Sequence, residues 1–155
     1  MDTVYLEWGK VDEAIWTMCD AIKRDYDFDV IVGISRGGLV PAVRISHIFD
    51  DKRLLLVEAK YYKDIGVRDD RPKITMHLKE EDISGKRILL VDDVADTGET
   101  LIAIKEYIEG LSPKELRVAV IASKSISQVK PDYTVFNTDR WIIFPWEKMP
   151  VEKKR

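Results

Sequence analysis

Hydrophobic positions along the chain recur with two periods, one typical of helices and one typical of strands. Apolar side chains return at helical spacing over residues 11–26 and again over 39–49, which predicts two amphipathic helices. Between them, the β-branched run 29–34 ends in a glycine-rich turn, and 53–60 is a second run of strand type. The first part of the chain is therefore expected to fold as helix, strand, loop, helix and strand.

The second part continues this alternation after a polar interruption. Residues 61–72 are too charged for a core and are expected to form a long mobile loop, while 73–78 alternate like an exposed strand. Residues 87–91 are continuously apolar, as in a strand buried on both faces of a parallel sheet. One face of a helix follows over 101–111, and 116–122 form a further buried strand. Strands that alternate with helices predict an α/β fold whose ligands bind beyond the carboxyl ends of the strands.

The composition is that of a globular protein with one core. The chain has 155 residues, of which 45% are hydrophobic and 34% charged, so one domain over 1–155 is expected. No apolar run approaches the roughly 20 residues that span a bilayer. The first residues carry acid where a signal peptide carries base. We therefore expect a cytoplasmic protein without a membrane partner.

Charge and residue usage narrow the chemistry further. With one cysteine, Cys19, and two histidines, His47 and His77, the chain lacks the Cys/His cluster of a zinc site, so any metal is expected to be held by oxygen. The net charge is −3, and the basic run 153–155 is read as a solvated tail. Nucleic acid is therefore not an expected partner.

The most informative segment is 91–100, which places three aspartates, two threonines and a glycine between an apolar strand and a helix. Backbone N–H groups at the helix start, the threonine hydroxyls and the close approach that Gly98 allows suit a phosphate. The paired carboxylates Asp92 and Asp93 suit ribose hydroxyls or a hydrated Mg²⁺ ion. A helix cap next to a solvated turn is the alternative, but one capping task does not explain so many polar groups. The chain has no nucleotide-binding P-loop, and 33–38 misspaces the dinucleotide fingerprint.

Three segments in the same order resemble the type I phosphoribosyltransferases. Residues 91–100 look like the phosphoribosyl pyrophosphate motif of that family, an apolar strand followed by Asp-Asp and Asp-Thr-Gly-x-Thr. Residues 35–41 are similar to the pyrophosphate loop of the xanthine-guanine members, and 139–146 resemble their purine-binding end. Lys124 follows the last long strand, where these enzymes keep a lysine that reads the base. Two positions depart from the family: Glu99 places an acid beside the phosphate cradle, and Ser125 stands where the family has proline.

The resemblance implies both a fold and a reaction. The fold is a mainly parallel sheet with helices on both faces, a flexible hood loop over 61–77 and a purine-binding region over 124–150. The reaction is purine salvage: a 6-oxopurine (guanine, xanthine or hypoxanthine) takes the 5-phosphoribosyl group of phosphoribosyl pyrophosphate, with Mg²⁺ as cofactor and a homodimer or homotetramer as the assembly. A basic residue of the hood, Lys60, Lys63, Arg68 or Arg71, would reach the pyrophosphate, and the sequence does not choose among them.

The resemblance also assigns roles to single residues. Asp96 is the implied general base for the purine proton, and Asp93 the implied metal ligand. Trp141 stacks on the base, the backbone of Ile142 contacts its edge, and Lys124 donates to its 6-oxo group. The residues implied to bind phosphoribosyl pyrophosphate are Ser35, Arg36, Gly37, Gly38, Asp92, Asp93, Val94, Ala95, Asp96, Thr97, Gly98, Glu99 and Thr100.

Two other functions stay open from the sequence. One is a phosphoribosyltransferase for adenine, orotate or uracil, which Lys124 and the segment 139–146 disfavour. The other is a non-catalytic member of the fold that senses phosphoribosyl pyrophosphate and regulates nucleic acid. That function calls for a basic face or a fused DNA-binding domain, and this acidic chain indicates neither.

Overall fold

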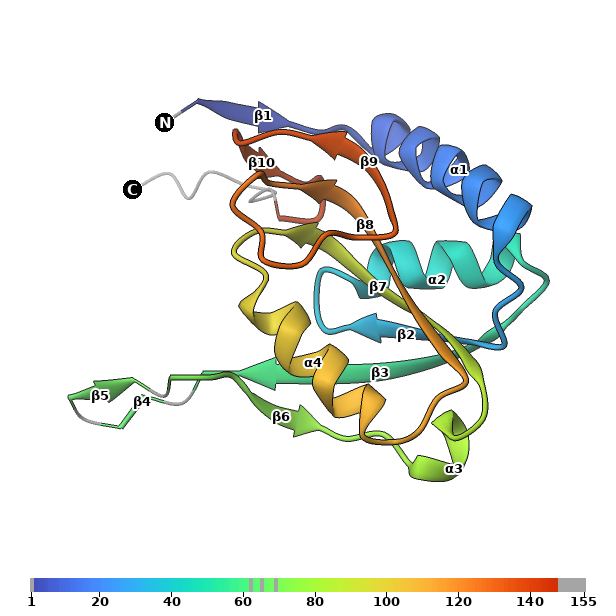
Figure 1. Ribbon diagram of the computed structural model, residues 1–155. Coiled ribbons are helices and arrows are strands. Elements are labelled where there is room, and N and C mark those ends of the chain that lie inside the picture. Colours follow the sequence, from blue (N-terminus) through green and yellow to red (C-terminus); the bar gives the residue numbers. More distant parts are fainter. Residues whose placement is uncertain (1, 62, 65, 69, 148–155) are drawn as a thin grey trace.

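The chain forms a six-stranded sheet between two layers of helices (Figure 1). The computed structural model describes residues 2–61, 63–64, 66–68 and 70–147. The strands of the sheet are β2 (Val30–Ile34), β3 (Arg53–Lys60), β6 (Lys73–Met76), β7 (Arg87–Ala95), β8 (Glu115–Ser123) and β9 (Tyr133–Asn137). Their order is β6-β3-β2-β7-β8-β9, and all neighbours are parallel except β3 and β6. The predicted α/β fold with a mainly parallel central sheet is confirmed.

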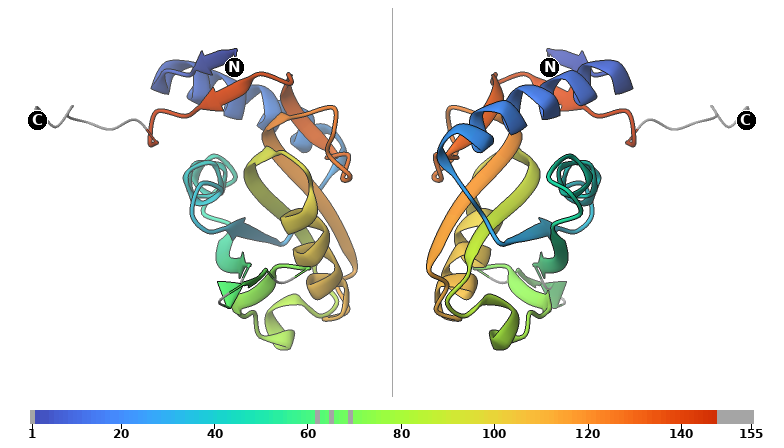
Figure 2. Two further views of the ribbon diagram at one scale, coloured as in Figure 1. Left: turned by 90° about the vertical axis from the view of Figure 1, so that its left-hand side faces the viewer. Right: turned by 90° about the vertical axis from the view of Figure 1, so that its right-hand side faces the viewer.

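Helices cover both faces of the sheet. Helices α1 (Trp8–Asp25) and α2 (Leu39–Ile48) pack on one face, and α4 (Glu99–Glu109) packs on the other, as the two side views show (Figure 2). The short helix α3 (Glu80–Ile83) precedes β7. The predicted helices are present with bounds close to those expected. None of the helices in the described part of the chain is long and apolar enough to cross a membrane.

The sequence of the central strands explains this layering, because successive side chains of a strand point to opposite faces. On β7, Leu89 packs with the cluster under α1 and α2, whereas Leu90 packs with the cluster under α4. Ile31 and Val32 divide in the same way on β2. All four side chains are fully buried. The centre of the sheet therefore requires strands without polar positions, which is why 87–91 is a continuous apolar run.

The connections around β2 and β7 create a crevice. Strand β2 continues through α2 to β3 on one side, and its neighbour β7 continues through α4 to β8 on the other. The segments that follow these two strands therefore leave the sheet in opposite directions. Open α/β sheets bind their ligands at such a switch point, beyond the carboxyl ends of the strands.

Two small strand pairs flank the main sheet. β1 (Thr3–Tyr5) pairs in parallel with β10 (Trp141–Ile143), which brings distant parts of the sequence together. β4 (Lys63–Asp64) and β5 (Val67–Arg68) form an antiparallel hairpin that projects beyond the carboxyl end of β3 (Figure 1). The hydrophobic pattern reveals neither pair, because these strands span only two or three residues each.

The structure corrects two expectations from the sequence. One loop is expected over 61–72, but this segment contains the hairpin β4–β5. Residues 62, 65 and 69 of the expected loop lie outside the described residues, and its mobility stays a prediction. The strand expected over 87–91 continues to Ala95, and its pairing with β8 continues to Ser123. Two polar residues, Asp92 and Asp93, lie in this extension, where they line a hollow at the carboxyl end of the sheet.

Leu90→Ala is expected to lower the free energy of unfolding by about 2 to 5 kcal/mol, because truncation of a fully buried leucine leaves a cavity. Urea denaturation measures the loss. Leu56→Ala is the matched control, since Leu56 is 39% exposed and its removal leaves less of a cavity. Equal losses in the two variants would contradict the place of Leu90 in the core.

Candidate active site

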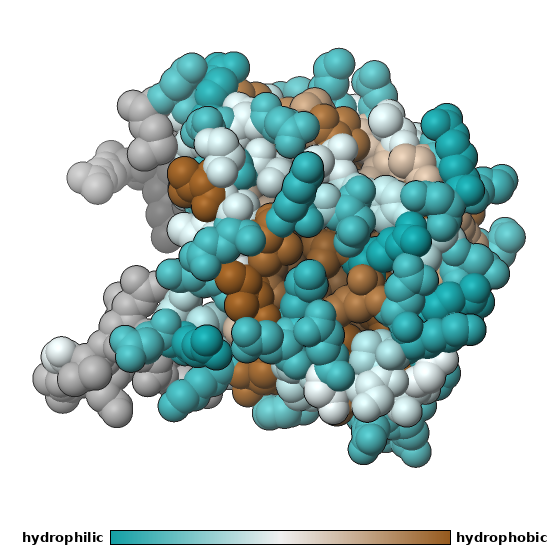
Figure 3. Space-filling model, viewed as in Figure 1, coloured by the Kyte–Doolittle hydropathy of each residue, from teal (hydrophilic) through white to brown (hydrophobic). Residues whose placement is uncertain are grey.

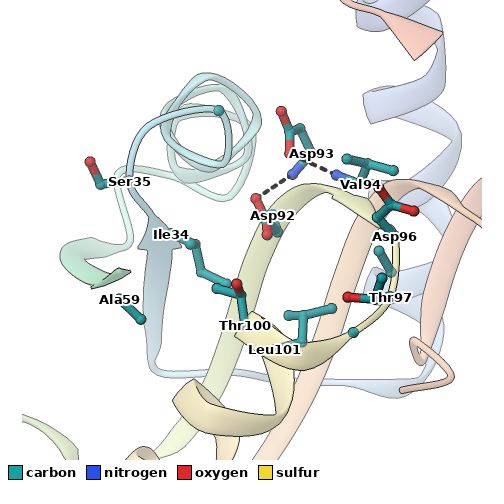
Figure 4. A pocket seen from close by; sticks show the side chains of 13 residues that line it. Ile34, Ser35, Ala59, Asp92, Asp93, Val94, Asp96, Thr97, Thr100 and Leu101 are labelled. Carbon is teal, nitrogen blue, oxygen red and sulfur yellow. Dashed lines mark hydrogen bonds between the residues drawn. The ribbon is translucent and has the colours of Figure 1, made fainter. Parts of the chain in front are cut away.

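A hollow of about 320 Å³ opens at the switch point between β2 and β7. Figure 4 shows the aspartates of β7 and the loop after it, with Ser35 across the opening, and the space-filling view shows the molecule hollowed on this side (Figure 3). Its wall consists of Ile34, Ser35, Gly37, Ala59, Asp92, Asp93, Val94, Ala95, Asp96, Thr97, Gly98, Thr100 and Leu101. All but Ile34, Ala59 and Leu101 are among the residues that the sequence singles out.

Two glycines let the loop after β2 lie directly against the acids at the end of β7. A Cβ atom on Gly37 would lie 2.0 Å from Asp93 Oδ2, and one on Gly38 would lie 2.6 Å from the carbonyl oxygens of Ile34 and Val91. Any side chain at these positions would displace the loop. The N–H of Gly38 donates to the carbonyl of Ile34 at 3.0 Å, which closes the turn before α2. The loop and the acids therefore form one continuous wall.

Asp92 and Asp93 are fixed in place by the backbone. Asp92 Oδ1 accepts a hydrogen bond from the N–H of Asp93, and Asp93 Oδ1 accepts one from the N–H of Val94, both at 2.8 Å. Burial raises the pKa of both carboxyl groups, and the neighbouring charge of Asp93 raises the pKa of Asp92 further. The free protein therefore holds two carboxylates in surroundings that disfavour their charge.

The start of α4 faces the same hollow. Gly98 precedes the helix with φ of +88°, a conformation that favours glycine, and a Cβ atom there would lie 3.0 Å from Ser127 Oγ. The first N–H groups of a helix have no intrahelical acceptor and lie at the positive end of its dipole. Thr97 and Thr100 add hydroxyl groups to this part of the wall. The arrangement suits a phosphate group.

Three predicted residues from distant parts of the sequence meet beside the hollow. Lys124 Nζ lies 3.3 Å from Asp96 Oδ1 and 4.9 Å from the centroid of the Trp141 ring. The Lys124 side chain is 12% exposed, whereas Trp141 is 47% exposed. The N–H of Lys124 also donates to the carbonyl of Ala95 at 2.9 Å, which ties the end of β8 to the end of β7. The structure thus brings a carboxylate, an ammonium group and an aromatic ring together.

The pairing of β1 with β10 holds Trp141 in this position. The N–H of Trp141 donates to the carbonyl of Asp2, and the N–H of Leu6 donates to the carbonyl of Ile143, both at 3.0 Å. Alternate residues pair along a parallel ladder, so the N–H and C=O of Ile142 point to the other edge of β10. The side chain of Ile142 is buried in the core. Because the side chain of Ile142 is anchored in the core, its backbone N–H and C=O and the ring of the neighbouring Trp141 are presented at one edge of β10.

Ser125 links the lysine to this strand. Asp139 Oδ1 accepts hydrogen bonds from the N–H and the hydroxyl of Ser125, at 2.8 and 2.7 Å. These bonds hold the pKa of the Asp139 carboxyl below its ordinary value. Proline at position 125 would remove both donors. Ser125, which departs from the family pattern, therefore ties the chain just after Lys124 to Asp139, in the segment before Trp141.

Three of the residues predicted to bind phosphoribosyl pyrophosphate do not line the hollow. Arg36 is exposed, and Gly38 is buried behind the wall. Glu99 is also exposed and accepts a hydrogen bond from the hydroxyl of Tyr61. An acid is tolerated beside a phosphate cradle only when its side chain points outward, and Glu99 meets this condition.

Other residues enter the site without a signal in the sequence. Ile34, Ala59 and Leu101 line the hollow but are ordinary apolar positions at the ends of elements. Glu58 lies in the middle of β3 and accepts a hydrogen bond from Ser35. A lone glutamate in a strand is a common surface residue, so only the contact reveals it.

The crevice defines a class of protein: an α/β protein that binds a phosphorylated ligand where its strand order reverses. Within that class, the chain belongs to the phosphoribosyl transferase domain family, whose model matches residues 5–152. The resemblance of the three sequence segments to this family is confirmed.

Several relatives and solved structures are similar over most of the chain. A xanthine-guanine phosphoribosyltransferase of Ruegeria sp. is 32% identical over 92% of the chain and 84% of its own length. One of Idiomarina loihiensis is 34% identical over 92% of the chain and 86% of its own length. The crystal structure of a purine phosphoribosyltransferase from Pyrococcus horikoshii superposes with a TM-score of 0.90 at 46% identity, covering 99% of this chain and all of that one.

The donors at the end of β7 fit a hard divalent cation. Among the described residues, no group of three or more His, Cys, Asp or Glu gathers around one point. Asp92 and Asp93 are two adjacent carboxylates, and Mg²⁺ typically takes one or two carboxylates together with waters and ligand oxygens. A cation beside them would also offset the unfavourable burial of their charge.

Asp92→Asn is expected to stabilise the metal-free protein at pH 7, because it removes a disfavoured charge and keeps an oxygen that accepts from the N–H of Asp93. The pKa of Asp92 is raised above its ordinary value of 3.8, so folding binds a proton and stability falls as pH rises through this range. Each pKa unit corresponds to about 1.4 kcal/mol, and about 1 kcal/mol shifts Tm by roughly 2 to 4 °C at this size.

Thermal unfolding in EDTA between pH 4 and 7 measures the difference. The gain should be largest at pH 7 and should shrink as the pH falls toward the ordinary value of 3.8, where protonation of the Asp92 carboxyl begins in the unfolded state as well. Asp132→Asn is a control, because Asp132 Oδ2 accepts a hydrogen bond from the N–H of Val118 at 2.7 Å and carries a structural contact. A lower Tm for Asp92→Asn at pH 7 would contradict the electrostatic account.

Proposed function

We propose that the chain transfers the 5-phosphoribosyl group of phosphoribosyl pyrophosphate to a 6-oxopurine in purine salvage. Pyrophosphate and the nucleoside 5′-monophosphate are the products. The observation that carries the proposal is the position of Lys124 Nζ, 3.3 Å from Asp96 Oδ1 and 4.9 Å from the ring centroid of Trp141. The names of the similar proteins, xanthine-guanine and purine phosphoribosyltransferases, support the same reaction and class of base.

The crevice supplies separate places for the parts of phosphoribosyl pyrophosphate. The helix start and the hydroxyls of Thr97 and Thr100 take the 5′-phosphate. The carboxylates of Asp92 and Asp93 take the ribose hydroxyls, and Mg²⁺ held by Asp93 would neutralise charge on the departing pyrophosphate. The loop around Gly37 takes the pyrophosphate, because a glycine leaves the backbone on that side of the wall open to close approach.

The purine takes the place beside Trp141. In the free protein the Lys124 ammonium lies over the ring of Trp141. A base that stacks on this face displaces the ammonium to the edge of the base, where a 6-oxo oxygen accepts its hydrogen bond. The N–H and C=O of Ile142, which point away from β1, are available to the remaining edge.

The reaction needs a group that removes one proton. A ring nitrogen of the purine attacks the anomeric carbon, the C–O bond to pyrophosphate breaks, and the imidazole ring loses a proton from its other nitrogen. Asp96 is the proposed acceptor, because it lies in the wall of the hollow on the side of Lys124 and Trp141. The hood over 61–77 is proposed to close over the reactants and exclude water, which would otherwise attack the same carbon.

Product formation with phosphoribosyl pyrophosphate and four bases tests the proposal. Guanine and at least one of xanthine and hypoxanthine should be substrates. Adenine should be about ten- to a hundredfold poorer, because its amine and the Lys124 ammonium are both donors and a buried unpaired donor costs roughly 1 to 3 kcal/mol. Lys124→Met should lose this discrimination, and Lys114→Met, at the opposite end of β8, should retain it. Equal turnover of adenine and guanine by the unaltered protein would contradict the proposed role of Lys124.

Asp96→Asn should lower turnover by about 10² to 10⁴, the contribution of a positioned general base, because it keeps the size of the side chain and removes its basicity. Phosphoribosyl pyrophosphate binding should change little, since backbone amides hold the phosphate. Steady-state kinetics and calorimetry measure the two effects.

Asp92→Asn supplies the contrast. The Asp92 carboxylate is proposed to bind the substrate and not to take the proton. Loss of its charge should therefore weaken the affinity for phosphoribosyl pyrophosphate and raise the Mg²⁺ concentration that the reaction needs. If Asp96→Asn instead loses affinity and keeps turnover at saturation, Asp96 is a ligand and the proton leaves by another group.

A further inference from the structure

Glu58 joins three parts of the molecule through one carboxylate. Its Oε2 accepts a hydrogen bond from the hydroxyl of Ser35 at 3.1 Å, and its Oε1 accepts one from the hydroxyl of Thr75 at 2.8 Å. Lys60 Nζ lies 3.4 Å from the same Oε1. The Glu58 side chain is 15% exposed. Both of its oxygens are therefore occupied, one by the loop after β2 and the other by the strands β3 and β6 that carry the hood.

The charge of Glu58 decides the direction of these hydrogen bonds. The hydroxyl of Thr75, that of Ser35 and the ammonium of Lys60 hold the pKa of the Glu58 carboxyl below its ordinary value. An ionised carboxylate only accepts hydrogen bonds, so the hydroxyl of Ser35 must donate to it. That proton is then not available to a phosphate oxygen, although Ser35 lines the hollow.

Besides the side chain of Arg36, which is exposed, the remaining donors of the loop are backbone groups. The N–H of Ser35 donates to Val57, that of Gly38 to Ile34, and that of Leu39 to Arg36. The N–H groups of Arg36 and Gly37 meet no acceptor within the described part of the chain. Where these two N–H groups point depends on the position of the loop, which begins at Ser35. Two hydrogen bonds hold Ser35, one from its N–H to the carbonyl of Val57 and one from its hydroxyl to Glu58.

We propose that Glu58 is a positioning residue: it holds Ser35 so that the N–H groups of Arg36 and Gly37 point at the departing pyrophosphate, and it links this loop to the base of the hood. The proposal rests on the phosphoribosyltransferase function proposed above. The link follows from the chain path, because the hairpin β4–β5 lies between Lys60 and Thr75 in sequence and both residues bind Glu58. A donor aimed in advance at a leaving group loses no energy to reorganisation when the group departs.

Steady-state kinetics of Glu58→Gln test this role. The KM for phosphoribosyl pyrophosphate should rise about tenfold, the size expected for a lost charge-assisted hydrogen bond, while the KM for guanine should change little. Ser35→Ala removes the same bond from the other side and should give a similar rise. Ser35→Ala removes only the contact with Glu58, whereas Glu58→Gln also alters the contacts with Thr75 and Lys60. The double variant should therefore be no worse than the more impaired single variant. Additive losses, or equal rises in both KM values, would overturn the proposal.

A second measurement does not need turnover. Hydrogen exchange of the amides in residues 35–39 of the free protein should quicken in Glu58→Gln and Ser35→Ala, because the loop loses its tether. Glu115→Gln is the matched control: this glutamate also lies on a strand and binds a cation, Arg117, at 2.9 Å, but far from the hollow. It should leave both the exchange and the KM values unchanged.

The two measurements separate the possible failures. If the unaltered protein shows no turnover with phosphoribosyl pyrophosphate and any of the four bases, the proposed function fails, and faster loop exchange in Glu58→Gln still supports the tether. If turnover is present and the loop exchanges at the same rate in all variants, the tether fails while the function stands.

Discussion

The contact between the loop after β2 and the acids at the end of β7 is the constraint on which the site depends. Gly37 lies so close to Asp93 that a Cβ atom would fall 2.0 Å from its carboxylate. This contact sets the width of the crevice, because the two segments leave the sheet in opposite directions beyond it. It also places a backbone wall beside two carboxylates whose pKa burial raises. The free protein therefore holds carboxylates where their charge is disfavoured, and a proton or a bound cation offsets this cost.

A second constraint joins the two ends of the described chain. β1 pairs with β10, and Arg140 lies 3.0 Å from Asp2, so the strand that carries Trp141 is held by the first residues of the protein. The aromatic ring thereby remains 47% exposed without losing its position. The end of the crevice at the start of α4 is built from the main sheet, whereas the end beside Trp141 is built from the small parallel pair β1 and β10. Lys124 joins the two ends, because it follows β8 and contacts both the ring and Asp96.

The sequence predicts the parts of this structure that rest on periodicity and on short motifs. Leu89 and Leu90 are buried on opposite faces, and such a strand is visible as a continuous apolar run. The cluster from Asp92 to Thr100 is visible because so many polar groups rarely follow a buried strand. The pairing of β1 with β10 has no such signal, since three residues show no period and their partners lie at the other end of the chain. Glu58 has none either, because its role depends on a contact with Ser35 across two strands.

Two lysines near the site form ion pairs with acids in the free protein, and one of these pairs links recognition of the base to the chemistry. Lys124 pairs with Asp96, and Lys60 pairs with Glu58. A base with a 6-oxo group draws the Lys124 ammonium to its own oxygen, and the same movement leaves the Asp96 carboxylate without its partner. Under the proposed mechanism, the purine proton can then reach Oδ1 of Asp96, the oxygen that Lys124 contacts in the free protein. A base that offers an amine at this edge does not attract the ammonium, so the ion pair persists and Oδ1 remains occupied. Under the proposed mechanism, one ion pair therefore couples the choice of base to the readiness of the group that removes its proton.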